Sequence, residues 1–132
     1  MGTVRLKSRL LRTAALAACA LSFHAGAAGA QDDAVMRANR MAYESLMRCF
    51  VANAHAGDER QTVGDTAKAA SYRAKARKSF DLAYAAGEKI GLSDDKISRD
   101  LDYAQATELP HLISDQHYQM DTASTCKALG LM

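Results

Sequence analysis

The chain has 132 residues, of which 48% are hydrophobic and 24% are charged, and its formal net charge is +2. This length suits a single domain. The positive charge comes from residues 1–30, which hold four basic residues and no acidic one, whereas residues 31–132 hold 13 basic and 15 acidic residues. Because a nucleic-acid-binding domain carries a basic surface, we expect no nucleic-acid partner for the folded part of the chain.

Residues 1–30 have the three-part pattern of a secretory signal peptide. A basic stretch is followed by the short apolar run 13–23, and Ala28-Gly29-Ala30 supplies small residues for cleavage before Gln31. A transmembrane helix needs about 20 apolar residues, so this run is too short to be one. We predict cleavage near Ala30, a single domain at residues 31–132 without a transmembrane segment, and a periplasmic or secreted bacterial protein.

An alternative processing site lies inside the same segment. Leu16-Ala17-Ala18-Cys19 resembles the box at which bacterial lipoproteins are cleaved and lipidated. Lipidation at Cys19 would tether the domain to a membrane. Only six uncharged residues separate Arg12 from Cys19, which is a short apolar core for such a signal, so plain cleavage is the preferred interpretation.

Cleavage near Ala30 leaves two cysteines, Cys49 and Cys126. An even number of cysteines in an oxidising compartment predicts a disulfide. A disulfide between them would close a loop of 77 residues, which stabilises a domain by roughly 4 to 5 kcal/mol. The alternative is a pair of buried free thiols. No C-x-x-C motif is present, so thioredoxin-like chemistry and c-type haem attachment are not indicated.

The pattern of apolar residues after residue 30 predicts helices throughout. The first helix is expected from about Asp33 to Ala56, capped by Asp32 or Asp33 and ended by Gly57, with a polar loop over 57–65. At 100° per residue, one side of this helix is apolar. The residues on this stripe are Val35, Ala38, Ala42, Leu46 and Cys49.

The second helix is expected from about Thr66 to Ile90, closed by Gly91. Small residues dominate its apolar seam, so a neighbouring backbone can approach closely, and Lys75 is predicted on the opposite face. The seam consists of Ala69, Tyr72, Ala76, Phe80, Ala83, Gly87 and Ile90.

Two further helices are predicted before the C-terminus. Ser93 caps the third helix, and Leu109-Pro110 ends it, because proline disturbs a helix interior. The fourth helix is expected from about Pro110 to Leu129, with Gly130 as its C-terminal cap. The sequence therefore predicts an all-α protein, a small antiparallel bundle of about four helices stapled by one disulfide.

Asn39 and Asn53 are polar residues on the otherwise apolar side of the first helix. Each side chain can bond to a neighbouring backbone. The more specific hypothesis is that the two asparagines line a polar groove for a ligand or partner.

Histidines supply the only candidate for metal binding. His111 and His117 are each followed four residues later by an aspartate, Asp115 or Asp121, which is a spacing that places two ligands on one helix face. Such pairs are usually solvated, so we expect no cofactor. The acidic residues Asp94, Asp95, Asp100 and Asp102 lack the spacing of a calcium loop and are interpreted as a helix start and an exposed face.

No phosphate-binding loop, nucleophile elbow or zinc-protease motif occurs in the sequence. The favoured hypothesis is a non-catalytic binding protein whose partner is another envelope or secreted protein. Two alternatives remain open: a periplasmic stress chaperone, and a weak metal-binding protein or enzyme that uses His111 and His117.

Overall fold

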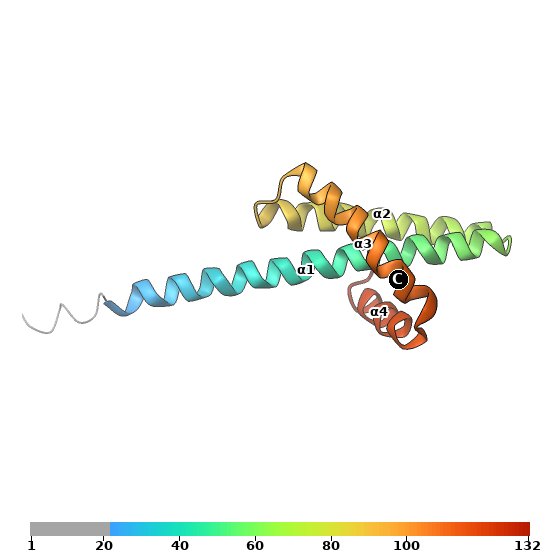
Figure 1. The fold of residues 1–132 in the computed structure, drawn as a ribbon. Coiled ribbons are helices and arrows are strands. Elements are labelled where there is room, and N and C mark those ends of the chain that lie inside the picture. Colours follow the sequence, from blue (N-terminus) through green and yellow to red (C-terminus); the bar gives the residue numbers. More distant parts are fainter. Residues whose placement is uncertain (1–21) are drawn as a thin grey trace, which may run out of the picture. The chain divides into compact units, whose positions relative to one another are not determined.

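A computed structural model describes residues 22–132, with side chains from residue 29 onward. Within this part of the chain the fold is all-α, with four helices and no strand, which confirms the predicted fold class (Figure 1). The helices are α1 (Ser22–Thr62), α2 (Thr66–Lys89), α3 (Asp94–Ser114) and α4 (Gln116–Ala128). The lipidation site predicted at Cys19 lies outside the described residues, as do the basic and most of the apolar parts of the predicted signal peptide.

The chain divides after Val35 into two compact units, and the second unit, Met36–Met132, contains the buried core. The predicted apolar stripe of α1 is wrong in its first half: Val35 is 53% exposed, and Ala38 and Ala42 are exposed too. Apolar periodicity marks the face a helix is able to bury, and no described side chain packs on this stretch. In the described part of the chain, every helix is too short or too polar to span a bilayer.

Both predicted ends of the first helix are wrong. Asp32 and Asp33, expected to cap its start, lie inside α1, and the helix does not end at Gly57. It continues to Thr62, and only residues 63–65 connect it to α2. Gly57 is instead a contact point, because a Cβ atom there would lie 3.2 Å from the Arg73 Cγ and 3.4 Å from the Ala69 carbonyl oxygen of α2. The two antiparallel helices of the hairpin are therefore close to each other at Gly57, and only the flexible Arg73 side chain would have to shift to admit a Cβ atom there.

Three helices end in the same way, on a glycine with positive φ. At the end of α1, the Gly64 N–H donates to the Gln61 carbonyl at 3.1 Å and the Asp65 N–H to the Arg60 carbonyl at 2.9 Å. This is the Schellman arrangement, in which a glycine leaves the helix in the left-handed conformation. The three glycines are Gly64, Gly91 and Gly130, with φ of 76°, 76° and 69°. The ends predicted at Gly91 and Gly130 are therefore confirmed.

The boundary between the last two helices is five residues later than predicted. Pro110 lies inside α3, which continues to Ser114. The break comes at Asp115, whose backbone is extended and whose carboxylate accepts from the Tyr118 N–H at 3.0 Å, capping α4. Proline removes one N–H donor and crowds the carbonyl four residues earlier, yet α3 continues through Pro110 for one more turn. The Asp115 carboxylate offers the backbone a competing hydrogen bond, and the helix ends there.

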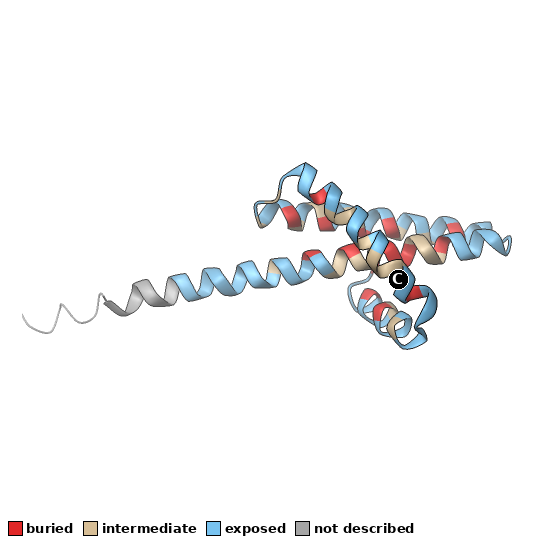
Figure 2. Ribbon diagram, in the orientation of Figure 1, coloured by how far each residue is buried: buried red, intermediate tan, exposed pale blue. Residues whose placement is uncertain are grey.

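Buried residues lie where the helices meet, along the inner sides of α1 and α2 and at isolated positions of α3 and α4 (Figure 2). Tyr43, Met47, Ala83 and Ile97 form one cluster, and a second cluster joins residues 51–52 of α1 to Leu112 of α3. On α2 the predicted small-residue seam is buried at Ala69, Ala76, Ala83 and Gly87. Lys75, expected to face water, is half-buried, and its ammonium lies 5.5 Å from the centre of the Tyr72 ring.

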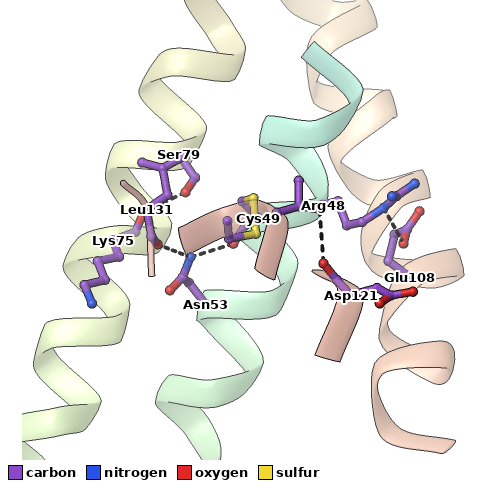
Figure 3. The surroundings of a disulfide bond; sticks show 10 residues. Arg48, Cys49, Asn53, Lys75, Ser79, Glu108, Asp121 and Leu131 are labelled. Atoms are coloured by element: carbon purple, nitrogen blue, oxygen red, sulfur yellow. Dashed lines mark hydrogen bonds and ion pairs between the residues drawn. A yellow bond between two sulfur atoms is a disulfide. The ribbon is translucent and has the colours of Figure 1, made fainter. Parts of the chain in front are cut away.

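The C-terminus is fixed to the middle of α1 by a disulfide and a buried amide (Figure 3). The predicted Cys49–Cys126 bond is present, with an S–S distance of 2.09 Å, and both cysteines are fully buried. Beside it, the Asn53 Nδ2 donates to the Cys49 and Leu131 carbonyls, each at 2.8 Å. Leu131 is itself fully buried, so the last residues of the chain belong to the core.

Candidate functional site

An open cleft of about 500 Å³ lies between α1 and α3 and is the candidate site. Its walls come from one side of α1, from the residues that follow α2 and from the first four turns of α3. The apolar residues Met47, Ile90, Leu92 and Ala104 line it together with charged and hydroxyl side chains. These polar lining residues are Arg40, Tyr43, Glu44, Arg48, Lys96, Asp100, Tyr103, Thr107 and Glu108.

Tyr43 and Asp100 connect the two walls of the cleft. Tyr43 is 5% exposed, and its hydroxyl donates to the Asp100 Oδ2 at 3.1 Å. Lys96, one turn earlier on α3, forms an ion pair with the other oxygen of the same carboxylate. Burial, and then the bond to Asp100, raise the pKa of Tyr43 well above its usual range. At neutral pH the hydroxyl is therefore a fixed hydrogen-bond donor.

A second set of polar contacts in the cleft involves Arg48 and Glu108. The Arg48 Nε lies 3.2 Å from the Glu108 Oε2, as an ion pair without hydrogen-bond geometry, and the Tyr118 hydroxyl donates to the same oxygen. The guanidinium also lies 5.6 Å from the centre of the Tyr118 ring, within the range of a cation–π contact. Burial, followed by the bond to Glu108, raises the pKa of Tyr118 to about 12.

The carboxylates of α3 hold it to all three other helices through tyrosine hydroxyls. Each of three acidic residues of α3 accepts a hydroxyl from a different helix. The pairs are Tyr43–Asp100 from α1, Tyr84–Asp94 from α2 and Tyr118–Glu108 from α4. From the sequence, Asp94 and Asp100 were expected only at a helix start and on an exposed face, and their contacts with tyrosines of other helices were not predicted. A tyrosine on an apolar stripe, such as Tyr43, was the available signal, because a buried hydroxyl needs a hydrogen-bond partner.

Two charges at the cleft remain without an ion pair. Arg40 and Glu44 lie four residues apart on α1 and are exposed, and neither has an ion-pair partner within residues 22–132. Tyr103, on the opposite wall, is 70% exposed. The cleft therefore offers a partner an apolar floor, one free cation, one free anion and an aromatic side chain.

Neither Asn39 nor Asn53, the two residues of the hypothetical polar groove, lines the α1–α3 cleft or the second cavity, which lies mainly between α1 and α2. Asn53 is fully buried and bonds to two backbone carbonyls, which confirms the simpler of the two interpretations for this residue. Its Oδ1 has no hydrogen-bond partner in the described residues. Asn39 is half-exposed, 14 residues earlier on α1, and the groove remains an untested hypothesis.

The two histidines proposed as metal ligands lie on different helices, His111 on α3 and His117 on α4, with the break at Asp115 between them. The His111 and Tyr118 ring centres are 5.5 Å apart with the rings tilted by 47°, and the His117 Nδ1 lies 3.1 Å from the Asp121 Oδ2 at an exposed position. Within residues 22–132, no group of three or more metal-ligating side chains comes together. The His111–Asp115 and His117–Asp121 pairs are therefore not brought together into one metal site among the described residues.

A second cavity, of about 520 Å³, lies mainly between α1 and α2. Its apolar wall includes Phe50 and Phe80, whose ring centres are 6.0 Å apart. Arg73 at its edge is occupied by an ion pair with Asp58 at 3.3 Å. The Arg73–Asp58 pair that crosses from α2 to α1 at this cavity is solvent-exposed on both sides, whereas the polar contact of Tyr43 in the cleft is largely buried.

The chain matches no family model, and no curated protein or solved structure is similar to it at a significant level. The observations that bear on function are therefore the geometry of the α1–α3 cleft and the signal-like pattern of residues 1–30.

Proposed function

We propose that this chain is a small exported protein of the bacterial envelope that binds another envelope or secreted protein without catalysing a reaction. The observation that carries the proposal is the α1–α3 cleft. Its size and its mixture of an apolar floor with a few oriented polar groups are typical of binding sites. Lys96–Asp100 and Arg48–Glu108 are already paired, so a partner side chain can bury apolar surface there without stranding those charges.

Export is supported by the signal-like pattern of residues 1–30 and by the buried disulfide, a bond that persists in oxidising compartments. The intact mass of the protein isolated from its native envelope tests this part of the proposal. We expect a chain that begins at or near Gln31. A mature protein that begins at a lipidated Cys19 would contradict simple cleavage.

Capture of a partner from envelope extract tests the binding role. Tyr103→Ala removes an exposed aromatic side chain from the cleft wall, and aromatic residues often dominate interface energies. Ile113→Ala is the matched control, because Ile113 is 65% exposed on the same helix but does not line the cleft. We expect a protein that is captured by the wild type and by Ile113→Ala, and much less by Tyr103→Ala. Equal capture by all three would refute the role of the cleft.

A periplasmic stress chaperone is the second candidate, and the contacts of α3 favour it. Three carboxylates of α3 accept hydrogen bonds from tyrosines of the other helices, and hydrogen bonds to a charged acceptor are stronger than those to a neutral one. Release of α3 would expose the cluster around Met47 and Ile97. Binding of an apolar fluorescent dye on acidification tests this candidate. A native protein that binds no dye down to the pH at which carboxylates protonate would rule it out.

A further inference from the structure

One row of residues on the surface of α1 includes exposed side chains that form no ion pair within the described residues. Met36, Arg40, Glu44 and Arg48 are spaced four residues apart and so follow one row of the helix surface. Met36 is 44% exposed, and Arg40 and Glu44 are exposed without an ion pair in the part of the chain that the structure describes. Arg48, at the other end of the row, lies in the cleft.

The charges of this row are complementary to those of the same row in a second, antiparallel copy of α1. In an antiparallel pair of α1 helices, the register that places Arg40 of one copy opposite Glu44 of the other also places Glu44 of the first opposite Arg40 of the second. The same register brings Met36 of each copy to the level of Arg48 in the cleft of the other. A twofold interface requires this reciprocity, because residue i contacts residue j and j contacts i.

We propose that a second copy of this chain docks antiparallel on α1, with two reciprocal Arg40–Glu44 ion pairs and with Met36 of each copy at the mouth of the other copy's cleft. Helices that pack about 20° from antiparallel stay in contact over several turns, as this register requires. Methionine is flexible and fills irregular apolar spaces such as the surroundings of Met47. The inference rests on the proposed function in one respect, that the cleft is a protein-binding surface.

Charge exchange at the two positions tests the docking. The mass of the protein, with its disulfide intact, is measured by light scattering and by sedimentation from low to high micromolar concentration. We expect a reversible monomer–dimer equilibrium for the wild type. Arg40→Glu and Glu44→Arg should each weaken the dimer by about tenfold or more, because each single variant opposes like charges across the interface. The double variant Arg40→Glu/Glu44→Arg should restore the dimer, and so should a mixture of the two single variants.

Arg99→Glu is the matched control, because Arg99 is exposed on α3, has no ion pair within residues 22–132 and does not line the cleft. It should dimerise like the wild type, and helix content measured by circular dichroism should be unchanged in every variant. A wild type that stays monomeric throughout, or single variants that the charge exchange does not rescue, would overturn the inference. These outcomes are independent of the envelope capture experiment: a monomer that still captures a cleft-dependent partner contradicts only the self-association, and a rescued dimer that captures nothing contradicts only the proposed partner.

Discussion

Gly87→Ala places a single methyl group at the tightest point of the helix packing. Glycine in a helix interior is less stable than alanine by roughly 0.5–1 kcal/mol, so the substitution favours the helix locally. The new Cβ, however, would lie 2.9 Å from the Ile97 Cδ1 and 3.1 Å from the Tyr43 Cε2. Ile97 is 1% exposed and the Tyr43 hydroxyl is bound to Asp100, so a shift of either side chain would disturb buried packing or break that hydrogen bond.

Extra methyl groups in a packed core cost about 1–3 kcal/mol, which exceeds the local gain. We therefore expect Gly87→Ala to lower the free energy of unfolding by about 0.5–2 kcal/mol, measured by urea denaturation of the disulfide-bonded protein. A loss of this size must come from the contact with α3, because the helix propensity alone has the opposite sign.

Gly57→Ala is the matched control in the same assay. Its Cβ would lie 3.2 Å from the Cγ of Arg73, whose exposed side chain is able to shift by a few tenths of an ångström. We expect it to be neutral or to stabilise the protein by up to about 1 kcal/mol. If Gly87→Ala is as stable as Gly57→Ala, the close approach of α2, α3 and Tyr43 described above is wrong.

Three other predictions follow from the core and its tyrosines. Cys126→Ser should lower the free energy of unfolding by about 2–5 kcal/mol in chemical denaturation, and an unchanged midpoint would mean that the disulfide contributes nothing. Burial raises the pKa values of Tyr43 and Tyr118, so the stability that these neutral hydroxyls contribute is complete below about pH 10, where tyrosine ionises in the unfolded chain, and is lost as the pH rises further. Urea titrations at increasing alkaline pH should show a shallower loss in Tyr118→Phe than in the wild type, and equal slopes would contradict the assignment. Ala76→Leu should destabilise the protein by about 1–3 kcal/mol, because Ala76 is buried in the α2 seam, whereas Lys78→Leu, at an exposed position of the same helix, should have little effect.

Local signals in the sequence were sufficient for the helix ends at Gly91 and Gly130, for the helix start at Ser93 and for the disulfide. Ser93, Gly91 and Gly130 each act on the backbone next to them, so their roles do not depend on the rest of the fold. The pairing of Cys49 with Cys126 followed from the number of cysteines left after the predicted cleavage. These features were predictable because each depends on a few neighbouring residues or on a count.

Features that depend on what packs against a residue were not predictable in this way. Gly57 has the composition of a helix end, but its role is set by α2 crossing at Ala69 and Arg73. Asp100 was interpreted as a solvated surface residue, but Tyr43 of another helix makes it a partly buried hydrogen-bond acceptor. The α1–α3 cleft depends on the path of α3, and periodicity within one helix carries no information on the position of its neighbour.

The attachment of the last residues to α1 has a consequence for the order of events during synthesis. A chain emerges with its N-terminus first, so α1 and α2 are complete while Cys126 and Leu131 are still to be made. Until then the Cys49 thiol has no partner, and the two carbonyls that flank Asn53 in the folded protein cannot both be in place. The part of the core around the disulfide can form only after almost the entire chain has been released, and a chain cut short by a few residues would lack Leu131 and the carbonyl that holds Asn53.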